Sequence, residues 1–284
     1  MTAPRRLTII CENTVGRPLP LLGEHGFACL IDSPAGRVLF DTGRGASLLH
    51  NLAVLGIDPA SIDAVVLSHG HYDHAGGLLP LLQRTGPRPV IAHHGIFAER
   101  YFVRGSEQRN LSLGATRLEL EAAGARFRFC TDCCEVMPRL WFSGRIPRTA
   151  ATESSDPSLV VAQVDGDGWQ PDPFDDDAAL AMLTPQGLVI ILGCAHAGLI
   201  NTVEHFRTQL ATPSVFAIVG GTHLGPASEA QFAVATGYLA GLEGTRIGVA
   251  HCTGQPRAAA LYSRFPERVF FAAAGCEFTV NPGT

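Results

Sequence analysis

The chain of 284 residues contains no lysine, so all 21 of its basic residues are arginine. This absence excludes Schiff-base chemistry and a Walker-type phosphate loop, because both depend on the lysine ammonium group. A phosphate or carboxylate group on a substrate would have to be bound by arginine, by backbone N–H groups or by metal ions.

Positive charge is also sparse and dispersed. The 21 arginines are outnumbered by 26 aspartates and glutamates, which gives a formal net charge of −5, and no basic run is longer than a pair. Nucleic acid and anionic membrane surfaces attract concentrated basic residues, so neither is expected as a partner. No apolar run has the length of a signal peptide or of a membrane span.

Eight cysteines are scattered without the regular spacing of a disulfide framework, which favours reduced thiols and a cytoplasmic location. Cys130, Cys133 and Cys134 include a C-x-x-C spacing, but no second pair of metal ligands follows at zinc-finger distance, so their role stays open. Hydrophobic residues make up 46% of the chain and charged residues 17%. No linker or repeat interrupts the sequence, so we expect a single domain over residues 1–284.

Four side chains that can bind metal ions lie within six residues. An apolar run, Ala64–Leu67, predicts a buried strand, and His69, His71, Asp73 and His74 follow it directly. Ligands at the end of a strand are held by the sheet and still face an open edge. Imidazole nitrogen and carboxylate oxygen together suit zinc, iron, manganese and related ions. The segment therefore predicts a metal site.

The last hundred residues repeat one construction three times. An apolar strand is followed at once by a histidine and then by a pattern typical of a helix. The strands are expected at 188–192, 215–219 and 246–250, and the histidines are His196, His223 and His251. This arrangement places the three imidazoles on one edge of a sheet.

These residues resemble the metallo-β-lactamase superfamily, whose hallmark is H-x-H-x-D-H after a strand. The segment Leu39–Gly43 is similar to the first motif of that superfamily. Within it, Glu12–Thr14, Glu24–Gly26 and the turns that carry His196, His223 and His251 resemble the branch of archaeal dihydropterin-(ribofuranosyl)aminobenzene-phosphate synthases. The resemblance extends from about residue 7 to residue 280.

The resemblance implies an α+β fold, the αββα sandwich, with two mixed β-sheets face to face and helices on the outside. It also implies two divalent ions at one edge, most simply zinc, with manganese, iron or magnesium as alternatives. Carried over to this sequence, the ligands of one ion would be His69, His71 and His196. The ligands of the other would be Asp73, His74 and His251.

The bridging position departs from the family pattern. Most dinuclear members place an aspartate at the end of the strand before the last histidine ligand, and no aspartate stands there in this chain. Cys194 or a hydroxide ion could bridge instead, or the second ion could be bound weakly. Asp41 is expected to orient a ligand imidazole, and His223 is expected to contact the substrate rather than a metal ion.

The resemblance implies a metal-dependent hydrolase that attacks a small anionic metabolite through a metal-bound hydroxide, with Asp73 and His223 as catalytic residues. The residues expected to bind the substrate are Glu24, His25, Arg100, Arg104 and Arg109. The alternatives are a transferase related to the synthases, a non-catalytic protein that binds a ligand and retains its metals, and a diiron redox enzyme. The acidic run from Asp172 to Asp177 is interpreted as a solvated loop, and a homo-oligomer stays open.

Overall fold

Two seven-stranded β-sheets form the body of the protein in a computed structural model that describes residues 5–163 and 168–281. In spatial order, the strands of the first sheet are β18 (Glu277–Val280), β1 (Arg5–Cys11), β2 (Ala28–Ser33), β3 (Gly36–Phe40), β4 (Ala64–Val66), β5 (Arg88–Ala92) and β8 (Ala125–Phe129). Those of the second sheet are β17 (Val269–Phe271), β16 (Arg246–Ala250), β15 (Val215–Gly221), β14 (Gly187–Leu192), β13 (Ala179–Thr184), β10 (Leu140–Phe142) and β9 (Cys134–Met137).

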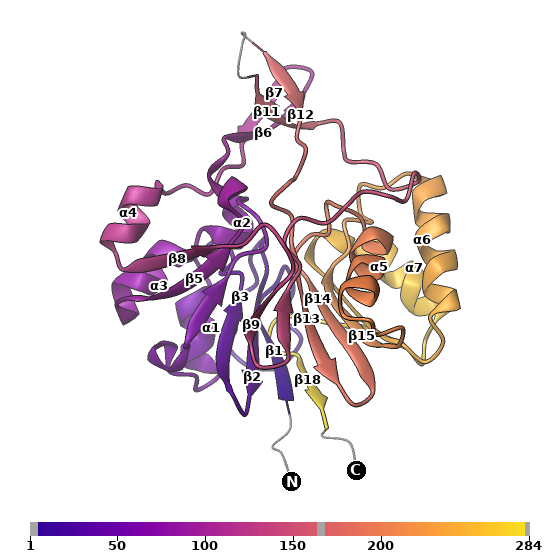
Figure 1. Ribbon diagram of the computed structural model, residues 1–284, viewed down its shortest axis with the longest axis horizontal. Coiled ribbons are helices and arrows are strands. Elements are labelled where there is room, and N and C mark those ends of the chain that lie inside the picture. The colour runs from indigo at the N-terminus through magenta and orange to yellow at the C-terminus, as the bar shows by residue number, and fades with distance from the viewer. Residues whose placement is uncertain (1–4, 164–167, 282–284) are drawn as a thin grey trace.

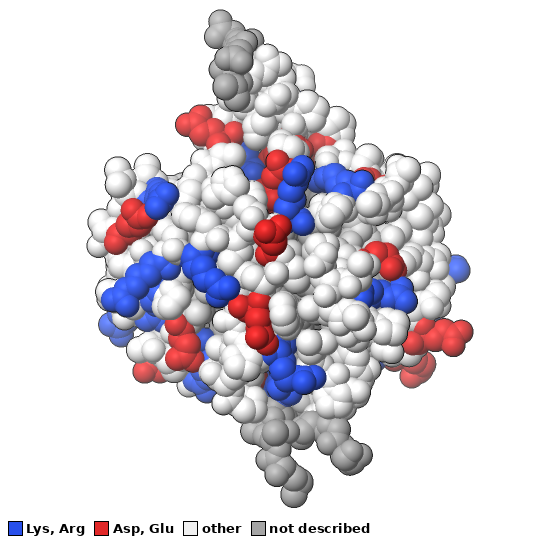
Figure 2. All heavy atoms as spheres, in the orientation of Figure 1, with Lys and Arg blue, Asp and Glu red and all other residues white. Residues whose placement is uncertain are grey.

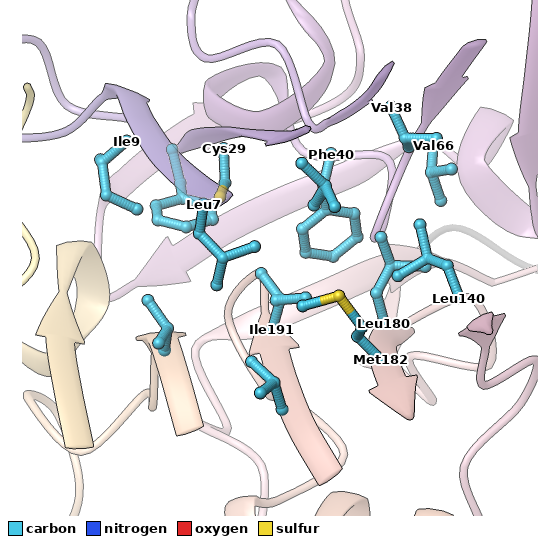
Figure 3. Packing of buried hydrophobic residues seen from close by; sticks show 14 of the residues in the cluster. Leu7, Ile9, Cys29, Val38, Phe40, Val66, Leu140, Leu180, Met182 and Ile191 are labelled. Carbon is cyan, nitrogen blue, oxygen red and sulfur yellow. The ribbon is translucent and has the colours of Figure 1, made fainter. Parts of the chain in front are cut away.

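The two sheets pack face to face around a shared apolar core. Leu7 and Phe40 of the first sheet point toward Leu180 and Ile191 of the second (Figure 3). Neighbouring residues on the same strands point the opposite way because side chains alternate along a strand. Leu39, for example, is completely buried on the outer face of the first sheet. Both faces are apolar, so these strands appear in the sequence as continuous hydrophobic runs.

Helices cover the outer face of each sheet (Figure 1). The first sheet is covered by α1 (Leu48–Val54), α3 (Leu78–Thr85) and α4 (Arg117–Ala122), and the second by α5 (Leu199–Gln209), α6 (Glu229–Gly241) and α7 (Gln255–Arg264). The helical residues buried against the sheets include Leu52, Leu81 and Phe206. The order helix, sheet, sheet, helix confirms the predicted αββα sandwich.

Strand direction brings distant segments to one edge. In the first sheet β3, β4, β5 and β8 run parallel, and in the second sheet β14, β15, β16 and β17 run parallel. The carboxyl ends of parallel strands meet at the same edge, which is where open sheets usually carry their sites. The short helix α2 (Tyr72–Ala75) lies at this edge (Figure 1).

A third sheet projects from this edge and was not predicted. Its strands, in spatial order, are β12 (Trp169–Pro171), β11 (Leu159–Ala162), β6 (Arg100–Arg104) and β7 (Glu107–Asn110), at the top of Figure 1. All residues of β7 and β12 are exposed, so neither strand has the alternating pattern that indicates a strand. Within the described residues, no helix combines the length and the apolar composition that a membrane crossing requires.

Candidate metal centre

The three histidines expected to hold one ion lie together at the carboxyl edge of the sheets. His69 and His71 follow β4, and His196 follows β14 from the other sheet. The centroids of their rings are 4.5 Å (His69–His71), 4.8 Å (His69–His196) and 5.0 Å (His71–His196) apart. Strand ends from both sheets therefore bring three imidazoles into one cluster, which we call the first ligand set.

The residues expected to hold the other ion form a second ligand set beside the first. Nε2 of His74 lies 3.1 Å from Nε2 of His251, and the latter lies 3.3 Å from Oδ2 of Asp73. The rings of His69 and His74 are 4.3 Å apart, so the two sets are adjacent. The three side chains of the second set are buried.

Cys194 lies between the two sets. Its Sγ atom is 3.1 Å from Nε2 of His74. The ligand-type atoms of Cys194, His69 and His196 all lie within 4.8 Å of one another, and so do those of Cys194, His74 and His251. Burial raises the pKa of the Cys194 thiol well above its ordinary value. The structure thus places one sulfur atom within reach of both sets.

The donor atoms of the first set fit a bound ion. The Nε2 atoms of His69, His71 and His196 are buried and have no hydrogen-bond partner among the described residues. Leaving a buried polar atom unpaired costs free energy, and such atoms are uncommon in proteins. Three of them aimed into one cluster are explained by a shared ligand, and imidazole Nε2 is a preferred ligand of zinc and related ions.

The protonation states of the first ligand set and of Asp73 also fit metal binding. Burial lowers the pKa of His71 to about 3. Burial, together with the neighbouring histidines, lowers the pKa values of His69 and His196 well below the usual range. Burial acts to raise the pKa of Asp73, but hydrogen bonds from His25 and His251 outweigh it and hold that pKa well below its ordinary value. The histidines of the first set are therefore neutral and Asp73 is ionised, which are the forms that bind metal ions.

Asp41 and Ser68 orient two of the ligand rings. Oδ2 of Asp41 lies 2.7 Å from Nδ1 of His74, and the hydroxyl of Ser68 lies 2.8 Å from Nδ1 of His69. Ser68 also donates its backbone N–H and its hydroxyl to Asp41, both at 2.7 Å. Each ring is thereby fixed with Nε2 toward the cluster, as supporting residues of metal sites do. Ser68 was not predicted, although its place next to the motif could have indicated it.

Glu12 and Asn13 hold His251. A carboxylate oxygen of Glu12 accepts the backbone N–H of His251 at 2.7 Å, and Oδ1 of Asn13 lies 3.0 Å from its Nδ1. The backbone of His251 has φ of +50°, which is uncommon for a residue with a side chain. Ala195 and His223 are left-handed as well, with φ of +58° and +52°. Strained backbone of this kind concentrates at functional sites.

Phe174 and His223 complete the surroundings of the first ligand set. The ring of Phe174 stacks on His196 with centroids 4.0 Å apart and planes 8° apart, and the ring of His223 lies 4.3 Å from His196 on another side. Both ring nitrogens of His223 are buried without a hydrogen-bond partner among the described residues. Phe174 was not predicted, because a lone aromatic residue in an acidic segment gives no signal of its position.

The acidic run from Asp172 to Asp177 is not a solvated loop, which corrects the interpretation of the sequence. Asp172, Asp176 and Asp177 are buried. Asp172 and Asp176 form ion pairs with the buried Arg100, the first at 2.6 Å and the second at 2.5 Å, and Asp177 accepts the backbone N–H of Ala197 at 2.7 Å. The run anchors the surroundings of the metal centre, and its buried carboxylates pair with Arg100 and with a backbone N–H group.

The residues expected to bind the substrate are not brought together. Arg100 is committed to its two aspartates, whereas Arg104 and Arg109 are exposed on β6 and β7, where Arg109 pairs with Glu107 at 3.0 Å. The carboxylate of Glu24 accepts four backbone N–H groups of residues 44–47. Only His25 reaches the metal centre, where its Nε2 lies 3.1 Å from Oδ2 of Asp73.

An αββα sandwich with these two ligand sets at its edge is the architecture of metal-dependent hydrolases of the β-lactamase type. The family model for the metallo-β-lactamase superfamily matches residues 22–203, and the chain belongs to this superfamily. A 7,8-dihydropterin-6-methyl-4-(β-D-ribofuranosyl)-aminobenzene-5'-phosphate synthase from Methanocaldococcus jannaschii is 29% identical over 257 residues, which are 88% of this chain and 87% of that protein.

Solved structures share the fold. The crystal structure of Tm1679, described as a metal-dependent hydrolase of the β-lactamase superfamily, superposes with a TM-score of 0.83 at 26% identity and covers 98% of this chain and 99% of that one. Zinc-bound PqqB from Methylobacterium extorquens has a TM-score of 0.58 at 13% identity, with 97% of this chain and all of that chain covered. The superfamily fold implies divalent metal ions, commonly zinc.

Proposed function

We propose that the protein is a metal-dependent hydrolase that acts on a small anionic metabolite at a dinuclear centre. The observation that carries this proposal is the convergence of the two ligand sets, with three buried Nε2 atoms that have no hydrogen-bond partner among the described residues. The first set, His69, His71 and His196, would hold one ion. Asp73, His74 and His251 would hold the other, and Cys194 lies within reach of both sets.

When bound, two adjacent divalent ions lower the pKa of a water molecule and polarise the oxygen atom of the bond under attack. Asp73 supports this chemistry as an ionised carboxylate that holds and orients the attacking water by accepting a hydrogen bond. Its low pKa favours this role over storage of a proton. His223 lies beside the first set with both ring nitrogens unpaired, so it is available to a substrate oxygen or a leaving group.

A cavity of about 1280 Å³ offers room for a metabolite. No ligand of either set lines it, but Phe174 belongs both to its wall and to the surroundings of His196, so this ring connects the cavity with the first ligand set. Arg145 and Arg148 line it and are exposed. Arg145 pairs with Asp175 at 2.8 Å, whereas Arg148 forms no ion pair with any described residue. Arg148 is therefore the better candidate to bind an anionic group, and no pattern in the sequence distinguished it from the other arginines.

The surface charge also supports a small substrate. Positive and negative side chains are interspersed over the face shown in Figure 2, without a continuous basic patch. Binding to nucleic acid relies on such patches. We therefore keep a small anionic molecule as the proposed partner.

A cytoplasmic location and the oligomeric state stay predictions, and light scattering with size exclusion would determine the latter.

A transferase is the second candidate. The specific observation in its favour is the 29% identity to the archaeal synthase over most of both chains. In that case the ions would assist loss of the leaving group from one substrate, and an amino-aromatic second substrate would replace water as the nucleophile. The same two ligand sets would serve this reaction.

Assays on the protein reconstituted with zinc, manganese or iron would separate these candidates. The panel would contain phosphodiesters, lactones, thioesters and a dihydropterin diphosphate, the last with and without an aminobenzene ribosyl phosphate. Turnover by water alone supports the hydrolase, and product formed only with both substrates supports the transferase. The variant His71→Ala serves as the control and should be folded but inactive. Metal-loaded protein that binds panel members without any turnover would indicate a non-catalytic binding protein.

A further inference from the structure

We propose that His25 is a ligand of the second ion and supplies the donor that the absent bridging aspartate leaves missing. The inference rests on the dinuclear centre of the proposed function. Nε2 of His25 lies 3.1 Å from Oδ2 of Asp73, and the centroid of its ring is 4.9 Å from that of His251. The ligand-type atoms of His25, Asp73 and His251 all lie within 4.8 Å of one another.

The segment around His25 is fixed in place on both sides. Before it, the Glu24 carboxylate accepts the backbone N–H groups of residues 44–47 at 3.0–3.3 Å. After it, Phe27 donates its N–H to the backbone oxygen of Asp73 at 3.1 Å, and Gly26 donates its own to Oδ1 of Asn13 at 3.3 Å. A preorganised backbone of this kind is what a ligand position requires, because a precise site depends on rigid support.

Gly26 permits this close approach. Its φ is +157°, and a Cβ atom built on it would lie 2.6 Å from the backbone oxygen of Asp73 and 3.0 Å from the backbone N of Arg44. Any side chain at this position would push the segment away from the metal motif. The absence of a side chain at Gly26 therefore allows His25 to lie against Asp73. A histidine on an ordinary surface loop would not require a glycine beside it.

Including His25 adds a further imidazole to the donor atoms of the second ligand set. The first set offers three imidazoles, whereas the second set alone offers two imidazoles and one carboxylate. With His25 the second set would offer three nitrogens and one oxygen, and the atoms of His25, Asp73 and His251 already lie within 4.8 Å of one another. Imidazole and carboxylate together suit zinc and related ions. Its side chain is 56% exposed, whereas that of Asp73 is 9% exposed and that of His251 is fully buried. His25 is thus the ligand on the solvent side of the second ion.

Metal binding tests this assignment without reference to activity. Metal-free wild type, His25→Ala and His25→Gln would be titrated with Zn²⁺ in the presence of a competing chelator, and with Co²⁺ while visible absorption is recorded. The matched control is His94→Ala, another exposed histidine, which lies outside every ligand group found in the described residues. Thermal melts of the metal-free proteins would show that both His25 variants are folded.

We expect wild type and His94→Ala to bind two ions. In both His25 variants the first equivalent should bind as in wild type, and the second should bind about 10-fold or more weakly, with a changed Co²⁺ spectrum for that equivalent only. Two equivalents with unchanged affinities in the His25 variants would overturn the inference and leave the dinuclear centre intact. Binding of only one ion by the wild type would also overturn the assignment of His25. The proposed hydrolase function could then still operate with one ion. A wild type that binds none would overturn the proposed function as well.

Discussion

Oδ2 of Asp41 lies 2.7 Å from Nδ1 of His74, and both side chains are completely buried. Asp41 also accepts the backbone N–H and the hydroxyl of Ser68. These contacts join the end of β3 to α2 across the first sheet. They fix the ring of His74 with Nε2 toward Cys194 and His251, so the geometry of the second ligand set depends on one carboxylate.

We predict that Asp41→Asn weakens metal binding by about 10- to 100-fold. The backbone N–H of Ser68 would keep the amide oxygen of the asparagine on its own side, so the amide NH₂ group would face Nδ1 of His74. That nitrogen would then have to accept a hydrogen bond, and the ring proton would move to Nε2, where it blocks ligation. Titration with Zn²⁺ checks this, with the half-exposed, remote Asp63→Asn as the control. Equal affinities in both variants would contradict the orienting role.

Cys194 gives a second prediction, because its sulfur lies between the two ligand sets. If it bridges the ions, Cys194→Ala should lower the affinity for metal by about 10-fold or more. Cys29→Ala removes another buried thiol, from the core between the sheets, and should leave metal binding unchanged. The comparison separates loss of a ligand from loss of packing. Unchanged metal content in Cys194→Ala, with a stability change of about 1 kcal/mol, would show that this thiol only packs.

Arg100 gives a third prediction, which separates a structural role from the substrate contact expected from the sequence. Arg100→Ala would leave the carboxylates of Asp172 and Asp176 buried without their partner. Removal of one member of a buried ion pair costs about 3–5 kcal/mol, whereas an exposed substitution usually changes stability by less than about 0.5 kcal/mol. Urea denaturation should therefore show a large decrease in the free energy of unfolding for Arg100→Ala and almost no decrease for the exposed Arg104→Ala. A stable Arg100→Ala variant with weakened binding of an anionic substrate would contradict the structural role.

The parts of the fold and site that local patterns encode could be predicted from the sequence. His69, His196 and His251 each follow an apolar strand, and the parallel arrangement of those strands brings their ends together. The partnership of Arg100 with Asp172 and Asp176 could not be predicted, because the residues are 72 and 76 positions apart and a charged run looks the same whether it is solvated or buried.

The third sheet and the position of His25 escaped prediction for a related reason. β6 pairs with β11, nearly sixty residues later in the sequence. The apolar run of β11 predicts a strand over residues 159–164, but most side chains of β6, β7 and β12 are at least partly exposed, so no hydrophobic period marks the strands beside it. His25 was expected to bind the substrate, not a metal ion. Its contact with Asp73 depends on the hydrogen bonds that residues 44–47 donate to Glu24 and that Gly26 donates to Asn13, and only the folded chain brings these groups together.

His205 gives the last prediction, which concerns the pH dependence of stability. It lies on α5, away from the ligand sets, and its Nε2 is 2.9 Å from the backbone oxygen of Ser143. Burial lowers its pKa below the ordinary value of 6.5, although the hydrogen bond to Ser143 acts in the opposite direction. As pH falls through 6.5, the unfolded chain takes up a proton at this position that the folded protein does not. Stability therefore falls in that window, until the lowered pKa of the folded state is reached.

His205→Gln should remove this contribution, because the glutamine amide can donate to Ser143 and does not titrate. The test is urea denaturation of metal-free wild type and variant at pH 7.5 and 5.5, so that the other histidines contribute equally to both proteins. The wild type should lose more free energy of unfolding between the two pH values than the variant does. Equal losses would mean that His205 binds its proton as readily in the folded protein as in the unfolded chain, and burial on α5 would then not control its charge.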